Sequence, residues 1–385
     1  MDAIDELIAE GLAAATDDRE RVWLLASYAI SARVRQTASA GEDEPLAPRF
    51  AAIREAAEIA ERLDDPNLMA VSVDVLGDLH EVDGNYAAAW AAYETQIPIL
   101  DRIENPAARA GWVHSASQRV LEIGGDPHRA KVLAEQAYEL GGRLSAHDRA
   151  HGIFGLMAAS YWLGEWDRVE ELLAEHLANP ELAAGARCTS VQSGPSLGAL
   201  VIAHRGDPQR ALDIARRTQT WEVSPGVVEG YLAQALVAAG AVDDGQELAT
   251  RVLTGARRWR WPEAAQAMIA SLVERKAWDP ARLFVGEIAD LRRGYPLLDG
   301  LAERAAGQAS AAHDEADSAR ESMARAMASF DRLPMPFEAA RTREALAGIS
   351  SGAERVVLLE AAVASYRSLG AAPHLARAEA LLAKT

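Results

Sequence analysis

Scarce residue types exclude several classes of protein for this chain of 385 residues. Its single cysteine, Cys188, leaves no disulfide within the chain and suits a reducing cytosol. Aromatic residues make up only 6%, and β-branched residues are also sparse, so a fold built from strands is disfavoured. No apolar run approaches the roughly 18 residues that a membrane-spanning helix needs, and we expect no membrane partner.

Positive charge is scarce as well. Lysine and arginine number 39 against 57 acidic residues, and the formal net charge is −18. Nucleic acids are bound mainly through phosphates that basic side chains neutralise, so we expect no direct nucleic-acid partner. Only three of the basic residues are lysines, a preference for arginine that is typical of a GC-rich bacterial gene. The first 15 residues, MDAIDELIAEGLAAA, are acidic overall and lack the positive charge of a signal peptide, so we expect a cytoplasmic location.

The chain does contain a recurring helix–turn–helix junction. The stretch GDPHRA at 125–130 returns as GDPQRA at 206–211. Glycine ends one helix because it tolerates the left-handed conformation, aspartate caps the next helix, and proline fits its first position. Between such junctions the apolar residues fall at helical spacing, and no segment alternates as a strand would. The sequence therefore predicts about twenty helices, each of roughly 10–20 residues.

The junctions recur at a nearly regular interval. The segment at 76–93, LGDLHEVDGNYAAAWAAY, shows the repeating unit most clearly. It resembles the tetratricopeptide repeat, a helix–turn–helix unit of about 34 residues in which small residues let two helices approach closely. A further turn is expected near Lys276. The turn glycines are spaced by 41, 39, 42 and 34 residues and are Gly84, Gly125, Gly164, Gly206 and Gly240.

This resemblance implies an all-α fold, a right-handed α–α superhelix or tetratricopeptide-like solenoid of about 8–10 helical hairpins. We expect atypical first repeats or a cap at 1–65, a degenerate repeat array at 66–348, and the last hairpin with a C-terminal capping helix at 349–385. The capping helix should pack on the preceding helix, which contains Val357, Leu358 and Ala361.

The tail carries a more particular resemblance, in PFEAARTREALA at 336–347 and YRSLGAAPHLARAEALLA at 366–383. It is similar to the C-terminal helical region of ATP-binding LuxR-type transcription regulators, antibiotic-regulatory proteins and some nucleotide cyclases. The resemblance implies a role in bacterial signalling or transcription regulation. No G-x-x-x-x-G-K-[ST] phosphate loop occurs in the chain, so we expect the sensor or scaffold part alone, either free-standing or excised from a larger regulator.

Two short motifs suggest chemistry, and each has a simpler interpretation. The stretch GPSLG at 194–198 matches the nucleophile elbow G-x-S-x-G, but its flanks continue the helical repeat where a strand is required. The simpler interpretation is a chain break at Gly194–Pro195 before a helix. His147 and His151 have the helical spacing of metal ligands, but no third ligand is signalled. We therefore predict no catalytic residue, no metal and no cofactor.

A basic and aromatic stretch, RRWRWPE at 257–263, is a weaker candidate for partner binding. Its tryptophans could stack on an anionic or aromatic partner beside the arginines. The simpler interpretation is that Trp259 and Trp261 cover a hairpin junction, since Pro262 marks a helix start there.

The concave surface is the better candidate site. In repeats of this resemblance it is lined by fixed positions on the first helix of each hairpin. We predict that Trp112, Arg119, His151 and Tyr161 share one partly exposed pocket, because buried aromatic residues with arginine form typical binding hot spots. Alternatively, Trp112 and Phe154 pack between hairpins. The full candidate groove is Asp74, Asp78, Trp112, Ser115, Arg119, His151, Phe154 and Tyr161.

Three hypotheses about function follow. The preferred one is a non-catalytic scaffold or sensor that binds a protein segment or a small effector in its groove. The second is the regulatory part of a split or excised signalling enzyme, such as a nucleotide cyclase or an ATPase-type regulator. The third, an enzyme in its own right, lacks a visible convergence of polar residues.

Overall fold

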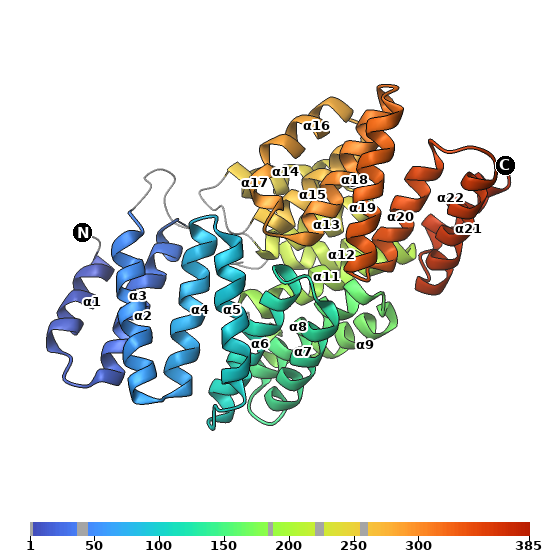
Figure 1. The fold of residues 1–385 in the computed structure, drawn as a ribbon. Coiled ribbons are helices and arrows are strands. Elements are labelled where there is room, and N and C mark those ends of the chain that lie inside the picture. The colour runs from blue at the N-terminus through green and yellow to red at the C-terminus, as the bar shows by residue number, and fades with distance from the viewer. Residues whose placement is uncertain (1–2, 37–44, 184–187, 220–226, 255–260) are drawn as a thin grey trace.

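The computed structural model describes residues 3–36, 45–183, 188–219, 227–254 and 261–385. Within those ranges it contains helices and no strand, which confirms the predicted all-α class (Figure 1). None of the described helices is both long enough and apolar enough to cross a membrane.

The helices run almost without interruption along the chain. In order they are α1 (Ala3–Ala14), α2 (Asp18–Gln36), α3 (Ala47–Leu63), α4 (Pro66–Val82), α5 (Tyr86–Leu100), α6 (Pro106–Glu122), α7 (Pro127–Gly141), α8 (Ala146–Leu163), α9 (Trp166–Leu177), α10 (Pro180–Ala183), α11 (Thr189–Arg205), α12 (Pro208–Gln219), α13 (Val227–Ala238), α14 (Val242–Thr254), α15 (Trp261–Glu274), α16 (Trp278–Glu287), α17 (Ala289–Arg292), α18 (Pro296–Ala312), α19 (Ala316–Arg332), α20 (Pro336–Ala347), α21 (Gly352–Leu369) and α22 (Ala372–Leu382).

Consecutive long helices pack as hairpins, and each hairpin stacks on the next. A single hairpin cannot bury its apolar face alone, so stacking supplies a continuous core. The array is therefore an all-α solenoid, as the repeat pattern predicts. Within the described ranges the hairpins are α2–α3, α4–α5, α6–α7, α8–α9, α11–α12, α13–α14, α15–α16, α18–α19 and α20–α21.

The turn glycines adopt the conformation that the sequence predicts for them. Their backbone φ angles are 74°, 64°, 75°, 97° and 88° at Gly84, Gly125, Gly164, Gly206 and Gly240. Lys276 continues the series with φ 54°, at the turn expected there. Only glycine adopts such left-handed angles at little cost, which explains its recurrence at these positions.

The second half of the solenoid packs against the first half. Helix α20 contacts α8, and helix α22 contacts α11 (Figure 1). Tyr295, just before α18, donates a hydrogen bond to the carboxylate of Glu81 on α4 at 3.1 Å. The array therefore coils back onto itself, and its inner faces enclose an interior. Three turn glycines of the first half abut prolines at helix starts in the second half: Gly125 with Pro296, Gly164 with Pro336, and Gly206 with Pro373.

The C-terminal helix α22 packs on α21, the helix that was expected to receive it. Val357 is 63% exposed, because it lies two residues off the buried helical stripe. Only Ala378 of α22 is fully buried. The α22 helix also contacts α11, so it joins the two halves as well as covering the last hairpin. The buried stripe of α21 is Leu359, Ala362, Val363, Tyr366 and Leu369.

Candidate functional site

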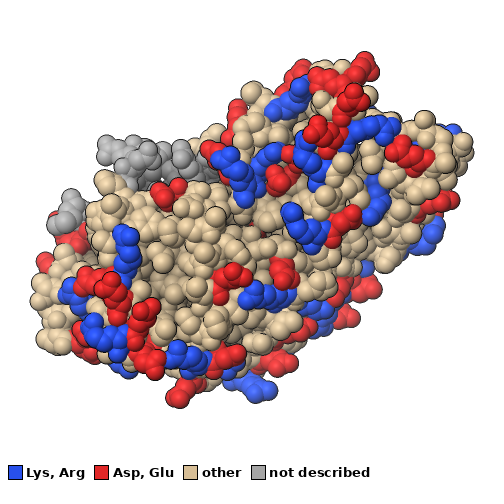
Figure 2. Space-filling model, in the orientation of Figure 1, with Lys and Arg blue, Asp and Glu red and all other residues tan. Residues whose placement is uncertain are grey.

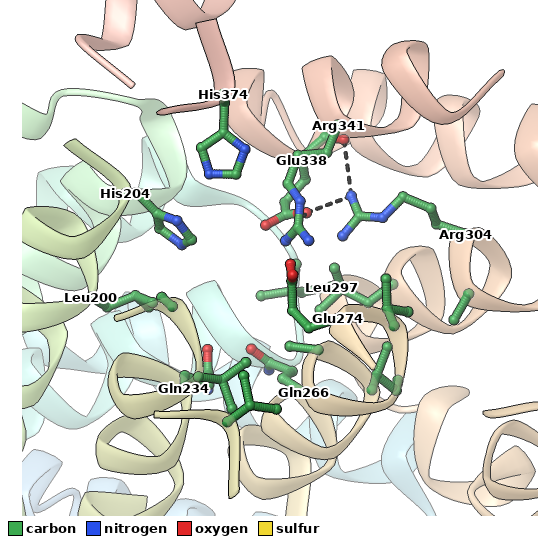
Figure 3. Close-up of a pocket in the computed structure, with 18 of the residues that line it drawn as sticks. Leu200, His204, Gln234, Gln266, Glu274, Leu297, Arg304, Glu338, Arg341 and His374 are labelled. Atoms are coloured by element: carbon green, nitrogen blue, oxygen red, sulfur yellow. Dashed lines mark hydrogen bonds and ion pairs between the residues drawn. The ribbon is translucent and has the colours of Figure 1, made fainter. Parts of the chain in front are cut away.

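The interior between the two halves contains a cavity of about 260 Å³. Side chains of α8, α11, α13, α15, α18 and α20 line it, together with residues of α22. Apart from α22, these are the first helices of hairpins, which the repeat pattern assigns to the concave surface. Figure 3 shows the lining residues converging from both halves of the chain.

The residues that line the cavity divide into an apolar part and a polar part. Such a division suits a ligand with an apolar body and one polar group, because a few placed polar side chains orient a ligand that apolar contacts hold. The apolar part includes Leu200, Val237, Ile269, Val273, Leu297 and Leu301. The polar part includes His204, Glu274, Arg304, Glu338, Arg341, His374 and Arg377.

Glu338 and two arginines form the electrostatic centre of the cavity. Arg304 Nη1 lies 2.5 Å from Glu338 Oε2 and also donates to the Glu338 carbonyl at 3.1 Å (Figure 3). Burial raises the pKa of Glu338, but the charges of Arg304 and Arg341 outweigh this effect and hold the pKa below its usual value. The carboxylate is therefore ionised at neutral pH and offsets one of the two positive charges.

Arg341 retains unused hydrogen-bonding capacity. Its guanidinium donates no hydrogen bond to any described residue, and Glu338 provides the only described carboxylate within ion-pair distance, at 3.9 Å. Burial disfavours the charge, but Glu338 and Tyr366 reverse that effect and raise the pKa of Arg341, so it remains protonated. A guanidinium has five N–H donors. Arg341 can therefore donate to an acceptor brought by a ligand.

Two neutral histidines, His204 and His374, also belong to the polar part of the cavity lining. The His204 ring lies 4.4 Å from the Phe337 ring and 5.5 Å from the His374 ring, measured between centroids. Burial, reinforced by Arg341, lowers the pKa of His204 to about 3. Burial likewise lowers the pKa of His374, whose Nδ1 lies 3.1 Å from Arg377 Nη2. Both rings are neutral at neutral pH, so the positive charge comes from the arginines.

Asp78 and Arg119 of the predicted groove form part of a buried ion network. Arg119 Nη2 donates to Asp78 Oδ1 at 2.8 Å, and Arg119 Nη1 lies 3.2 Å from Glu81 Oε1. Tyr93 donates to Asp78 at 2.9 Å. The carboxylate side chains are 3% exposed and the Arg119 side chain is 12% exposed. This network joins α4, α5 and α6, which gives Arg119 a structural role.

Three predicted groove residues meet at a second interior cavity of about 210 Å³, namely Ser115, Arg119 and Phe154. Ser115 also donates to Asp74 at 2.9 Å, which brings a fourth predicted residue beside it. The Phe154 ring packs 6.0 Å from the Tyr231 ring.

The structure does not gather Trp112, Arg119, His151 and Tyr161 in one pocket. Tyr161 lines the first cavity and Arg119 the second, whereas Trp112 and His151 line neither of the two. Trp112 donates through Nε1 to Asn67 on α4 at 2.8 Å. The expectation assumed an open groove, but helices from later repeats occupy the concave side and divide it.

The nucleophile-elbow pattern has a packing role instead. Ser196 is fully buried inside α11, in a described segment that contains no strand. The expected chain break at Gly194–Pro195 is also wrong, because α11 continues through Pro195. Proline has no N–H, so the carbonyl of Val191 lacks its helical donor. His176 Nε2 donates to that carbonyl at 2.6 Å.

The histidine pair acquires a third neighbour that the sequence did not signal. His151 Nε2 lies 2.9 Å from the sulfur of Cys188, and His147 lies on the same side of α8. Burial, together with His147, lowers the pKa of His151 to about 4, so its ring is neutral at neutral pH.

In the basic and aromatic stretch at 257–263, residues 257–260, Trp259 included, lie outside the described residues. Pro262 falls in the first turn of α15, as expected.

The chain matches no family model and no curated protein sequence. Among solved structures it is similar to the APC/C hetero-tetramer Cut9–Hcn1, at 11% identity over 96% of this chain and 92% of that chain, with a TM-score of 0.39. For the human IFIT1 dimer with m7Gppp-AAAA, the identity is 10% over 95% of this chain and 83% of that chain, with a TM-score of 0.40. For the P58(IPK) TPR domain, the identity is 12% over 93% of this chain and 98% of that chain, with a TM-score of 0.22.

Sequence reasoning missed the charged residues of the first cavity, although a signal for them was present. Glu338 and Arg341 lie in the stretch 336–347, and His374 and Arg377 lie in 366–383. These are the two stretches that carry the resemblance to bacterial regulators. The sequence does not predict that these residues line the same cavity as His204, which belongs to a distant repeat.

Proposed function

We propose that the chain is a non-catalytic binding module whose interior cavity receives a small effector with an apolar body and one anionic group. The observation that carries this proposal is Arg341, which lines the cavity with its side chain 18% exposed and donates no hydrogen bond to any described residue. An anionic acceptor on a ligand would form a charge-assisted hydrogen bond with this guanidinium, which is stronger than a hydrogen bond between neutral groups.

The charge balance of the cavity favours a single negative charge on the ligand. Three arginines and two glutamates line it, whereas the chain as a whole carries a net charge of −18. Figure 2 shows basic and acidic side chains intermixed over the visible outer face. A carboxylate is the best match, because its two oxygens fit the planar fork of a guanidinium.

The position of the cavity supports a sensing role. An occupant would contact Leu200 and His204 of the first half together with Arg341 and His374 of the second half. A ligand that binds only the coiled-back arrangement stabilises that arrangement by mass action. We therefore propose an effector sensor, and the resemblance of the tail supports a place in bacterial signalling or transcription regulation.

A fluorescent probe with this chemistry tests the proposal. The probe 1-anilinonaphthalene-8-sulfonate has an apolar body and one anionic group, and N-phenyl-1-naphthylamine has the same body without the charge. We expect saturable binding of the sulfonate, weakened at least about tenfold in Arg341→Met, since a charge-assisted hydrogen bond contributes roughly 1.5–3 kcal/mol. The uncharged probe should bind both proteins equally.

Arg320→Met is the matched control, because Arg320 lies on the exposed side of α19 and pairs with Glu354. It should bind both probes like the wild type. Equal affinity of Arg341→Met and wild type for the sulfonate, with both proteins folded by circular dichroism, would contradict the proposed role of the cavity.

A further inference from the structure

Three potential metal ligands converge where the start of α8 meets the start of α11. They are His147, His151 and Cys188, and one ligand atom from each lies within 4.8 Å of the others. The closest pair is His151 Nε2 and Cys188 Sγ, at 2.9 Å. Two of these side chains come from α8, and Cys188 is the residue just before α11.

The local fold fixes all three positions. His147 and His151 are one helical turn apart near the start of α8, so both project from the same face. Ser145 caps α8 by accepting from the N–H of Asp148 at 3.0 Å, which fixes where the helix begins. Cys188 is the residue that precedes α11, and α11 packs directly against α8.

We propose that His147, His151 and Cys188 bind a zinc ion that joins the start of α8 to the start of α11. Two imidazoles and one thiolate form the nitrogen and sulfur donor set that zinc prefers, with bond lengths of about 2.0–2.3 Å. Ligand atoms of a tetrahedral site are then roughly 3.5 Å apart, so the three side chains need only small shifts to surround an ion.

Glu181 of α10 supports this assignment. Its Oε2 lies 3.4 Å from His147 Nδ1, and both side chains are about two-fifths exposed, at 39% and 40%. A carboxylate beside a ligating histidine fixes the orientation of the ring, as is common around zinc. The partial exposure of this pair also provides a route by which an ion can enter.

A hydrogen-bonded thiol and imidazole without metal is the competing explanation for the 2.9 Å contact. The second histidine distinguishes the two explanations. A Cys188–His151 hydrogen bond does not need His147, whereas a metal site loses a ligand when His147 is removed. The chain has a single cysteine, so any thiolate signal from metal binding reports on Cys188 alone.

The experiment uses the full chain without a histidine tag, stripped of metal with a chelator. Zinc affinity is measured by competition with a chromophoric chelator, and thiolate ligation by the charge-transfer absorption of the Co²⁺ form. We expect one zinc ion per chain, bound at least about 100-fold more weakly by Cys188→Ser and by His147→Gln, since even second-shell changes cost about 10–100-fold. Zinc should raise the melting temperature of the wild type.

His128→Gln is the matched control, because His128 is exposed on neighbouring α7. It should bind zinc like the wild type. The Co²⁺ charge-transfer band should be absent from Cys188→Ser. If wild type binds zinc no more tightly than His147→Gln, the site does not exist. His147 is partly exposed, so its variant decides the question even if Cys188→Ser fails to fold.

Discussion

Replacing Gly164 by alanine should disrupt the contact between the two halves of the solenoid. A methyl group there would lie 2.6 Å from Pro336 Cγ and 2.7 Å from Leu369 Cδ2, which is too close for either contact. Gly84 provides a matched control, because its φ of 74° equals that of Gly164 within a degree and, apart from its chain neighbours, no described residue lies within 4 Å of an added methyl group.

The two variants share one cost and differ in another. Forcing alanine into the left-handed region costs about 1–2 kcal/mol in both. Overpacking against Pro336 and Leu369 adds about 1–3 kcal/mol in Gly164→Ala alone. We therefore expect Gly164→Ala to lose about 2–5 kcal/mol of unfolding free energy and Gly84→Ala about 1–2 kcal/mol.

Urea denaturation followed by circular dichroism measures the totals. Because repeat arrays can unfold in parts, amide hydrogen exchange should also be measured in α20 and α21. Exchange there should accelerate in Gly164→Ala and stay unchanged in Gly84→Ala. Equal destabilisation by the two substitutions, or unchanged exchange in α20 in both, would refute the coiled-back packing.

Three further predictions concern buried polar groups. His176→Leu should lower the unfolding free energy in urea by about 1–3 kcal/mol, because it leaves the Val191 carbonyl without a donor. Adding Pro195→Ala should reduce that loss, because alanine restores the helical N–H that donates to this carbonyl. A double mutant whose loss equals the sum of the two single losses would contradict this account. Stability should fall as the pH drops below about 6.5, because the unfolded chain binds a proton that buried His204, with a pKa of about 3, excludes. At pH 5 this one group accounts for up to about 2 kcal/mol. His204→Gln should shrink the difference between the unfolding midpoints at pH 7 and pH 5, and an unchanged difference would show that His204 is not the source. Arg119→Ala should cost about 3–5 kcal/mol by removing the positive charge that pairs with the buried carboxylates of Asp78 and Glu81, whereas a melting temperature equal to that of the wild type would show that the network contributes little.

Local features of the fold could be predicted from the sequence because their causes are local. Glycine at a left-handed turn, aspartate as a cap and proline in a first turn act within a few residues, so the turns at Gly125 and Gly206 were predictable. Pro195 shows the limit of such rules. Proline usually marks a helix start, but here His176 from the preceding hairpin satisfies the carbonyl that proline leaves without a donor.

The candidate sites were less predictable, because they depend on how far the solenoid coils. Counting positions along the first three hairpins selected Ser115 and Phe154, and both line the second cavity. It could not show that later repeats would meet the inner face and place Arg341 beside His204. The same limit applies to Cys188, which reaches His151 only through the packing of α11 on α8.

A crystal structure of the full chain with 1-anilinonaphthalene-8-sulfonate tests the central claim most directly. We predict that the naphthalene ring lies among Leu200, Ile269 and Leu301 and that a sulfonate oxygen accepts from the Arg341 guanidinium at about 2.7–3.2 Å. A probe bound on the outer surface, or one in the cavity whose sulfonate points away from Arg341, would contradict the assignment of this cavity to an anionic effector.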